Sequence, residues 1–332
     1  MKIFKTIEFE EIANFYHEQA GNRFISSEYL SHEYSNEKSS FFSLYDKKEL
    51  IACLGYIFIP IHSKEKECIY NSYLLERFLA HKKIRGSKYF SCLFDEVRED
   101  YQGDFLWALT GVTNFFIKRG FFKIKPETLR SYYFRPRLNL FNYNSYKIDK
   151  YISECSGLTK AKCYIGSSHI SMGNYDEFDQ EIYNCVSVDD LKPYFSKEYL
   201  KWYMHPTKFR ERKLFKVIVD SEIKMWGVIS VTKYMTAIID HIALQELDDC
   251  YSLMIELDIY IRSLGVLSCE YMYNPNSVTG SMVSKSLKKI GYNIVSTKPT
   301  FVYASSSMSL EGFNTEWICA PPCWQPKDGV II

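Results

Sequence analysis

The 332-residue sequence lacks an excess of charge, a long apolar run and the cysteine spacings of disulfide-rich or zinc-binding proteins. Its 41 basic and 40 acidic residues give a net charge of +1, which favours neither nucleic acid nor an anionic membrane as a partner. No apolar run reaches the roughly 18 to 20 residues that a membrane span needs. The charged N-terminal sequence MKIFKTIEFEEI has no apolar signal-peptide core, so we expect a cytoplasmic protein.

The ten cysteines are scattered along the chain, and only Cys319 and Cys323 lie close together. Disulfides are rare in a reducing compartment, so most of these cysteines should be free buried thiols. No histidine pair or second cysteine pair stands at a zinc-finger spacing. We therefore predict no metal site.

Length and repetition indicate two domains. The chain is longer than one typical core requires, and its 46% apolar residues can bury two cores. A glycine-containing strand and a later Gly-aromatic element occur in each half, with Gly227 standing 172 residues after Gly55 and Gly291 standing 171 after Gly120. We expect a duplicated unit in which strands and helices alternate.

The expected elements follow the same order in both halves. In the first half we predict strands at 41–45, 50–59, 74–80 and 105–109, a helix after residue 88 and another at 114–119. In the second half we predict strands at 214–219, 225–231, 235–242 and 269–273, with helices at 250–264 and 280–290. Gly120 and Gly291 would end the last helix of each copy.

The stretch from Leu74 to Phe94 is the most informative part of the chain. An apolar strand at 74–80 runs into a basic turn at 81–88, and an amphipathic helix follows. One face of that helix carries Phe90, Leu93, Phe94 and Val97. The free N–H groups and the positive dipole end of such a helix form an anion site.

This turn resembles the pyrophosphate loop of the GNAT acyltransferases. The spacing of that loop is kept by His81, Arg85, Gly86 and Ser91. Lys88 and Phe90 stand where the family usually has glycine or another small residue, so the loop here is bulkier, although Lys88 keeps a charge suited to phosphate. The resemblance implies an α/β (α+β) fold of two tandem GNAT-like domains, each a mixed, largely antiparallel sheet flanked by helices.

The resemblance also implies a division of labour between the domains. We expect an acyl-CoA-binding domain at 1–135, connecting strands and a loop at 136–170, and an acceptor-recognition domain at 171–332. The second copy lacks the Arg-x-x-Gly turn and carries Asp248 and Asp249 where phosphate would bind, so only the first copy should bind CoA.

The residues that the resemblance places at the cofactor are Phe78, Leu79, Ala80, Arg85, Gly86, Ser87, Lys88, Tyr89, Phe90, Asn114 and Phe116. The backbone N–H near Leu79 would face the thioester carbonyl and stabilise the oxyanion. Many members of the family protonate the leaving thiolate with a tyrosine at the position of Phe116, which cannot do so. Asn114 could contact substrate or cap a turn.

Glu76 is the candidate general base, because some relatives carry their base on this strand. Strand alternation would place it on the same face as Leu74 and Phe78, and burial there would raise the pKa of its carboxyl. The alternative is an ion pair with Arg77, Lys82 or Lys83, or simple exposure at an edge.

In the second copy, Asp240 and His241 are further catalytic candidates that could contact the acceptor, or else they form a structural pair. The sequence from Tyr199 to Pro206 resembles a block in tandem GNAT proteins of bacterial polysaccharide loci, some of which acylate nucleotide-linked amino sugars. Residues that could bind such a substrate are Trp202, Tyr203, His205, Asn274 and Asn276. The aromatic residues could instead be core residues of a helix end, and the asparagines could cap turns.

We therefore expect an enzyme that moves an acetyl or short hydroxyacyl group, such as 3-hydroxybutanoyl, from acyl-CoA to an amine. The acceptor would be a dTDP- or UDP-linked amino sugar for surface polysaccharide such as O-antigen, and the protein would be a monomer or homodimer. One alternative is a Fem-type aminoacyl transferase, although the near-zero net charge argues against tRNA. Another is a non-catalytic tandem GNAT-like scaffold.

Overall fold

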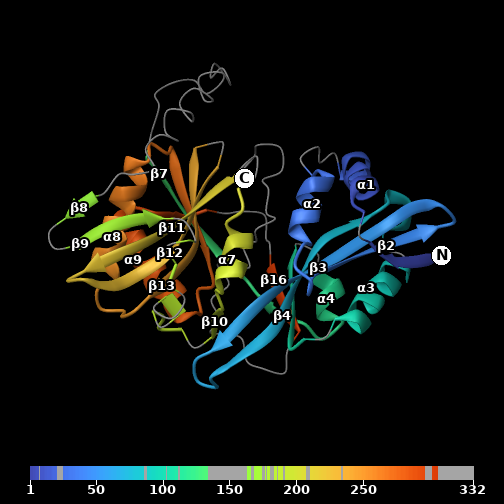
Figure 1. Ribbon diagram of the computed structural model, residues 1–332, viewed down its shortest axis with the longest axis horizontal. Helices are drawn as coiled ribbons and strands as arrows, with labels where there is room; N and C mark the ends of the chain where they lie inside the picture. Colours follow the sequence, from blue (N-terminus) through green and yellow to red (C-terminus); the bar gives the residue numbers. More distant parts are fainter. Residues whose placement is uncertain are drawn as a thin grey trace, which may run out of the picture. The chain divides into compact units, whose positions relative to one another are not determined.

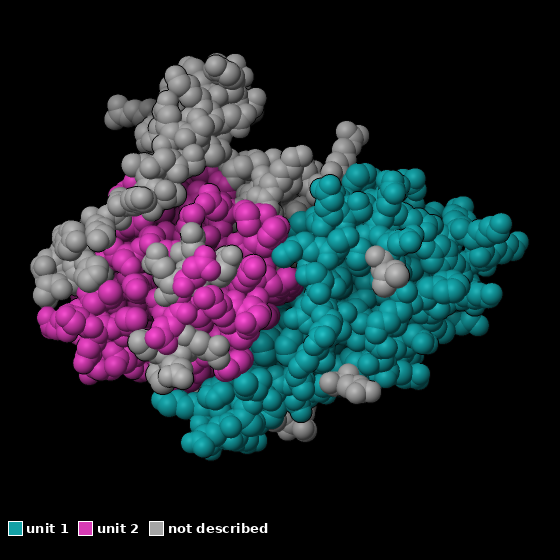
Figure 2. Space-filling view, in the orientation of Figure 1, with its two compact units in different colours: residues 1–124, 299–310, 323–332 teal, residues 125–298, 311–322 magenta. Residues whose placement is uncertain are grey.

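The computed structural model describes residues 1–6, 8–20, 25–85, 88–101, 103–110, 113–133, 163–165, 168–173, 176, 178–179, 183–184, 186–189, 191–206, 210–232, 235–295 and 301–305. They divide into two compact units, which Figure 2 colours separately. Among the described residues, unit 1 holds 1–124 and 301–305, and unit 2 holds 125–295.

Unit 1 is a mixed sheet with helices on both faces. Its elements are β1 (Lys2–Lys5), α1 (Glu10–Ala20), α2 (Ser27–Glu33), β2 (Ser40–Asp46), β3 (Glu49–Ser63), β4 (Cys68–Ala80), the 3₁₀ turn η1 (Lys82–Ile84), α3 (Lys88–Asp100), β5 (Phe105–Thr110), α4 (Thr113–Ile117), β6 (Phe122–Ile124) and β16 (Phe301–Ser305). The strand order is β1-β2-β3-β4-β5-β16-β6. As Figure 1 shows, α1 and α2 cover one face of this sheet, and α3 and α4 cover the other.

Unit 2 repeats this plan. Its elements are β7 (Glu127–Tyr132), β8 (Cys163–Ile165), β9 (Ser168–Gly173), β10 (Leu191–Pro193), α7 (Lys197–Tyr203), β11 (Arg210–Val219), β12 (Glu222–Thr232), β13 (Thr236–Leu244), α8 (Cys250–Ser263), β14 (Ser268–Tyr273), α9 (Val278–Ile290) and β15 (Asn293–Ile294). The strand order is β15-β7-β14-β13-β12-β11-β9-β8.

The two units share one topology. Three antiparallel strands, β2-β3-β4 or β11-β12-β13, lead through α3 or α8 into a parallel strand, β5 or β14. A last helix is then followed by a left-handed glycine, which is Gly120 with φ 79° three residues after α4 or Gly291 with φ 115° directly after α9. The predicted fold class and the predicted order of elements are confirmed.

The sequence did not indicate where the last strand of each half would pair. In unit 1, β16 lies between β5 and β6, and in unit 2, β7 lies between β14 and β15. The first half of the chain therefore supplies β7 to the sheet of unit 2, and the second half supplies β16 to the sheet of unit 1. This reciprocal exchange differs from the expected boundaries at 135 and 171, because β7 precedes the first boundary and β16 follows the second.

The apolar pattern explains why the helices dock. In α3, the predicted face is confirmed for Leu93, Phe94 and Val97, each 0% exposed against the sheet. On the other face of the same sheet, Ile12 of α1 and Leu30 of α2 are equally buried. Burial of each such side chain contributes about 1.5–3 kcal/mol, which holds both helical layers on the sheet.

Within the described part of the chain, no helix combines the length and the apolar character of a membrane span. The described histidine, cysteine, aspartate and glutamate side chains also form no group of three that could hold a metal ion.

Candidate active site at the end of strand β4

The end of β4 is where the regular sheet of unit 1 breaks. β4 pairs with its parallel neighbour β5 only from Ser72 to Leu75. Directly afterwards, Gly55 of β3 faces Glu76, but Cys53 faces Leu79, so β4 holds an extra residue. This is a β-bulge, and Arg77 within it has a left-handed φ of 61°. A bulge bends its strand, and here β4 leaves β5.

Because of the bulge, the side chains after Glu76 project to the opposite face from the one that regular alternation predicts. Simple alternation would put Glu76 and Phe78 on one face. The extra residue reverses the alternation, so Phe78 packs on the α3 side of the sheet, whereas Leu79 and Cys53 pack on the α1 and α2 side. Glu76, which faces Gly55 before the reversal, lies on the α1 and α2 side.

Glu76 is a partly exposed carboxyl at the bulge. Burial raises its pKa to about 7, the nearby Arg77 lowers it, and Glu33 raises it. No ion pair involves Glu76 within the described residues, because the guanidinium of the adjacent Arg77 is paired with Glu33. A carboxyl with this pKa can accept a proton near neutral pH, as a general base must.

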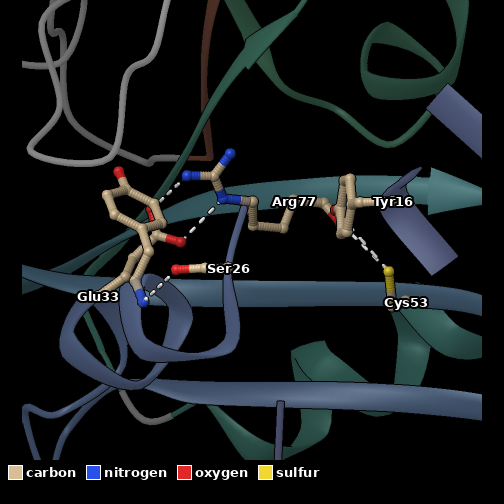
Figure 3. A network of polar contacts seen from close by, with 6 residues as sticks. Tyr16, Ser26, Glu33, Cys53 and Arg77 are labelled. Atoms are coloured by element: carbon tan, nitrogen blue, oxygen red, sulfur yellow. Dashed lines mark hydrogen bonds and ion pairs between the residues drawn. The ribbon is translucent and has the colours of Figure 1, made fainter. Parts of the chain in front are cut away.

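Arg77 forms an ion pair with Glu33 of α2, as Figure 3 shows. Its Nε lies 2.8 Å from Glu33 Oε2 and its Nη2 lies 2.9 Å from Oε1, so the pair is bidentate. The side chain of Glu33 is 1% exposed and that of Arg77 is 11% exposed. The Tyr16 hydroxyl donates to the Arg77 carbonyl oxygen. These contacts hold the bulge from two helices, α1 and α2.

The backbone of the β4 end offers N–H groups on both sides. The N–H of Leu79 lies against the Cys53 thiol. Burial raises the pKa of this thiol to about 12, and the hydrogen bond from the Leu79 N–H acts in the opposite direction. The next N–H on the same side, that of His81, donates to the Ile51 carbonyl oxygen at 2.7 Å. Successive N–H groups of a strand point to opposite sides, so those of Phe78 and Ala80 point away from β3.

The predicted phosphate turn lies between β4 and α3. His81 Nδ1 accepts from the Lys83 N–H at 3.2 Å and so caps η1, which is a structural role. Arg85 Nε donates to the Ala80 carbonyl oxygen at 3.1 Å. Lys88 is exposed at the start of α3, and Tyr89 after it is partly buried. Gly86, Ser87 and the side chain of Phe90 lie outside the described residues.

Two other predicted cofactor residues lie in α4. Phe116 is 1% exposed and packs against Phe78, Phe94 and Phe121 at ring-centroid distances of 5.8, 6.0 and 5.2 Å. It is a core residue. Asn114 is exposed in the first turn of the helix, and its backbone carbonyl oxygen accepts from the Lys118 N–H at 3.2 Å.

In unit 2, β13 ends in a comparable way. It pairs with β14 from Thr236 to Ile239, and the extra residue at its bulge is Asp240. Asp240 is 0% exposed and accepts from Arg212 Nε at 3.2 Å. The Arg212 guanidinium also lies 4.7 Å from the centroid of the Tyr203 ring. The structure thus gives Asp240 a buried ion pair, as expected of a structural residue.

His241 is buried among aromatic rings, with its ring centroid 5.0 Å from those of Phe195 and Trp226. It also lines a small pocket in unit 2, together with Tyr183 and Lys192. The Tyr203 ring that the Arg212 guanidinium contacts lies 6.2 Å from the ring of Phe195, so His241 and the Asp240–Arg212 pair border the same aromatic cluster.

The remaining predicted substrate residues are divided between core and surface. Tyr203 of α7 is 2% exposed, whereas Trp202 is partly buried and His205 is exposed. Asn274 Oδ1 accepts from the Asn276 N–H at 3.1 Å in the turn before α9. The two asparagines therefore shape this turn, which was the alternative to a substrate contact.

The sequence drew attention to Glu76 but not to Glu33 or Tyr34, which the structure places beside it. Glu33 stands 44 residues before Arg77, and no local pattern marks their pairing. The side chain of Tyr34 reaches Gly55, where an added Cβ would lie 2.5 Å from two of its ring atoms. Only the strained conformation of Arg77 and the absence of a side chain at Gly55 mark the site once the fold is known.

A scan against models of protein families finds no match for this chain, and a search of curated proteins finds none. Solved structures do resemble it. A GCN5-related N-acetyltransferase from Anabaena variabilis ATCC 29413 shares 8% identity over 91% of this chain and 72% of its own, with a TM-score of 0.58. A conserved protein from Enterococcus faecalis V583, described as a probable N-acyltransferase, shares 8% identity over 91% and 71%, with a TM-score of 0.56.

Saccharomyces cerevisiae N-myristoyltransferase with bound myristoyl-CoA and inhibitors is also similar, at 10% identity over 95% of this chain and 85% of its own, with a TM-score of 0.56. At these identities the likeness shows the fold alone. It confirms that the chain has the GNAT-type fold in both units.

Proposed function

We propose that this protein is an acyl-CoA-dependent N-acyltransferase of the GNAT type that acylates the amine of a nucleotide-linked amino sugar. The observation that carries the proposal is the end of β4. There the Glu76 carboxyl, with a pKa of about 7, stands at the bulge where β4 leaves β5, shortly before the basic turn that leads into α3. Acyl transfer from acyl-CoA to an amine needs a proton acceptor and free backbone N–H donors at the thioester, with a site for the CoA diphosphate nearby.

The basic turn and the first turn of α3 would hold the diphosphate of CoA. Arg85 and Lys88 supply positive charge, and the first N–H groups of a helix have no partner within the helix. Gly86 and Ser87 are predicted to contribute backbone N–H groups. The yeast structure contains myristoyl-CoA, which supports an acyl-CoA donor for a chain of this fold.

The backbone N–H groups of Phe78 or Ala80 would bind the thioester carbonyl oxygen. They point away from β3, toward the edge of β4 that pairs with β5 before the bulge. This assignment replaces Leu79, whose N–H lies against the Cys53 thiol. Such fixed donors are worth most in the tetrahedral intermediate, where the oxygen carries a full negative charge.

Glu76 would take the proton that the amine must lose. The amine arrives as an ammonium, one N–H bond breaks and its proton passes to the Glu76 carboxylate, and the freed lone pair of the nitrogen attacks the thioester carbon. The C–S bond then breaks, and CoA leaves as the thiolate. Phe116 offers no proton, so the thiolate leaves unprotonated or takes its proton from another donor.

The amino-sugar acceptor rests on the resemblance of the block from Tyr199 to Pro206 to polysaccharide-locus proteins. Within that block Trp202 and His205 remain accessible for a substrate, whereas Tyr203 is buried. Unit 2 is proposed to recognise the acceptor, since its own strand end carries a buried ion pair and the acidic residues Asp248 and Asp249 precede its helix α8.

The proposal is tested first with CoA and then with a complete reaction. CoA should raise the melting temperature of the wild type through simple linkage, and Arg85→Glu should weaken this shift. Acetyl-CoA with dTDP-4-amino-4,6-dideoxyglucose should then release a free thiol. No shift at millimolar CoA would instead favour a tandem GNAT-like scaffold, and acylation from aminoacyl-tRNA alone would favour a Fem-type transferase.

A further inference from the structure

Gly55 leaves room for the side chain of Tyr34. A Cβ added at Gly55 would lie 2.5 Å from Cε1 and Cζ of Tyr34 and closer still to the hydroxyl oxygen. No real Cβ approaches other atoms so closely. The Tyr34 hydroxyl therefore occupies the space that a side chain of residue 55 would fill.

That space adjoins the side chain of Glu76. Gly55 and Glu76 face each other across the antiparallel β3–β4 pair. Residues that are directly opposite project to the same face of a sheet, with Cβ atoms about 4.5–5.5 Å apart. The Tyr34 hydroxyl thus stands beside the Glu76 carboxyl, which is the proposed base.

The Tyr34 hydroxyl is buried and has no hydrogen-bond partner among the described residues. The polar groups near it have partners of their own. The Glu33 carboxylate binds the Arg77 guanidinium, and the Arg77 carbonyl oxygen accepts a hydrogen bond from Tyr16. A buried hydroxyl without a partner is costly, so its presence calls for a ligand or an ordered water.

The Tyr34 ring is held firmly in place. It stacks on Phe9 at a centroid distance of 5.8 Å and meets the edge of Phe41 at 5.0 Å. Burial raises the pKa of its hydroxyl well above the usual range, Glu33 and Glu76 raise it further, and Arg77 lowers it. The phenol therefore keeps its proton throughout the pH range of an ordinary assay.

We propose that the Tyr34 hydroxyl and the Glu76 carboxylate together hold the amino group of the acceptor, which makes Tyr34 a substrate-binding residue. This inference rests on the proposed function. An incoming ammonium has three N–H groups, of which one would donate to a Glu76 oxygen and another to Tyr34 Oη. When the first proton passes to Glu76, the second bond still holds the nitrogen, and its new lone pair is free to attack.

This arrangement selects for primary amines. A primary amine that has lost its first proton to Glu76 keeps one N–H for Tyr34, and its other N–H bond breaks after the attack and passes its proton to the departing thiolate sulfur. A secondary amine has only one N–H left at that stage, so it cannot satisfy both needs. The acceptor class is therefore a primary amine on a carrier such as a sugar ring.

The first test compares Tyr34→Phe with Tyr45→Phe. Tyr45 donates to Glu11 Oε2 at 2.6 Å on the surface, so it is a matched control for the loss of a hydroxyl. With acetyl-CoA and dTDP-4-amino-4,6-dideoxyglucose, Tyr34→Phe should raise the acceptor KM about tenfold or more and leave the acyl-CoA KM unchanged. Its melting temperature should stay equal or rise, because the lost hydroxyl had no partner.

A second test needs no turnover. The ¹³C signal of the Glu76 carboxyl, assigned with Glu76→Gln, is followed while glucosamine or N-acetylglucosamine is added. Glucosamine should move the signal in the wild type and much less in Tyr34→Phe, and N-acetylglucosamine, which lacks the amine, should not move it. A signal that glucosamine moves equally in both proteins, or in neither, would overturn the assignment.

The two tests separate the inference from the proposed function. Glucosamine binding at Glu76 without any acyl transfer would leave the amine site in place and refute the acyltransferase. An active wild type whose acceptor KM is unchanged in Tyr34→Phe would keep the enzyme and refute the role of Tyr34. A lower melting temperature with a parallel loss of all activity would show that the hydroxyl is structural.

Discussion

Strand β4 of unit 1 and strand β13 of unit 2 leave their parallel neighbours in the same way, but they carry different chemistry there. In both strands the parallel pairing stops at a β-bulge and an acidic residue follows, Glu76 in β4 and Asp240 in β13. Asp240 is fully buried and bound to Arg212, whereas Glu76 is partly exposed and has no ion pair within the described chain. The same backbone thus supports an ion-paired carboxylate in one unit and, in the other, the carboxylate that we propose as the general base.

The segments that follow sharpen this contrast. After β4 the chain enters a turn with Lys82, Lys83 and Arg85, and α3 begins at Lys88. After β13 the corresponding region carries Asp248 and Asp249 before α8. Because charge near a helix N-terminus affects whether an anion can bind there, the proposed phosphate site is expected in unit 1 and not in unit 2.

The largest expected effect is on the stability of unit 2. Asp240→Ala should lower the free energy of unfolding by about 3–5 kcal/mol, because it removes the buried carboxylate that the buried Arg212 guanidinium binds. Denaturant unfolding measures this loss, and Asp249→Ala, which removes an exposed carboxylate with no capping bond, is the control. Equal stability of both variants would mean that Asp240 is not held as the structure shows.

In unit 1, removal of the carboxylate at the equivalent bulge, that of Glu76, should lower catalysis. Glu76→Gln keeps the size of the side chain but cannot accept a proton, so kcat should fall about a hundredfold or more. The acyl-CoA KM should stay the same. A pH–rate profile with saturating donor checks this, and a profile of unchanged shape and height would remove Glu76 from the mechanism.

The phosphate turn can be tested by charge reversal. Arg85→Glu should raise the acyl-CoA KM about tenfold or more, because it places an anion against the diphosphate. Lys288→Glu makes the same change on an exposed position of α9 and should leave that constant unaltered. If both variants keep the wild-type constant, the donor site lies elsewhere.

The raised pKa of Glu76 also predicts how stability depends on pH. Its folded value of about 7 exceeds an unfolded value of about 4.3, so between these pH values the folded state binds more protons. Stability contributed by this group is therefore present at low pH and lost as pH rises. From pH 5 to pH 8 the wild type should lose about 2–3 kcal/mol that Glu76→Gln does not lose, as measured by urea unfolding.

The smallest effect is expected at the acidic turn of unit 2. Asp249→Asn should leave CoA affinity unchanged, because this turn binds no phosphate in our proposal. Isothermal titration with CoA measures the affinity. A clear gain in affinity would show that CoA reaches α8, and it would end the contrast between the two units.

The sequence by itself determined the elements and their order. Apolar periodicity in α3 and the left-handed glycines after α4 and α9 are local signals, and each predicted the element that the structure contains. The basic turn after β4 and the acidic turn after β13 are equally local, because charge is read directly from residue type. For the same reason, Glu76 could be proposed as a candidate base from its position as an unusual carboxylate in an apolar strand.

Only the tertiary structure decided which distant residues meet. The exchange of β7 and β16 depends on which sheet edge each strand reaches, and strand pairing leaves no local mark in the sequence. The bulge at Arg77 reversed the side-chain alternation that a regular strand would have, because one extra residue moves every later side chain to the other face. Glu33 and Tyr34 came to Arg77 and Glu76 through the docking of α2 on the sheet, since ion pairs and buried hydroxyls are formed by packing in space.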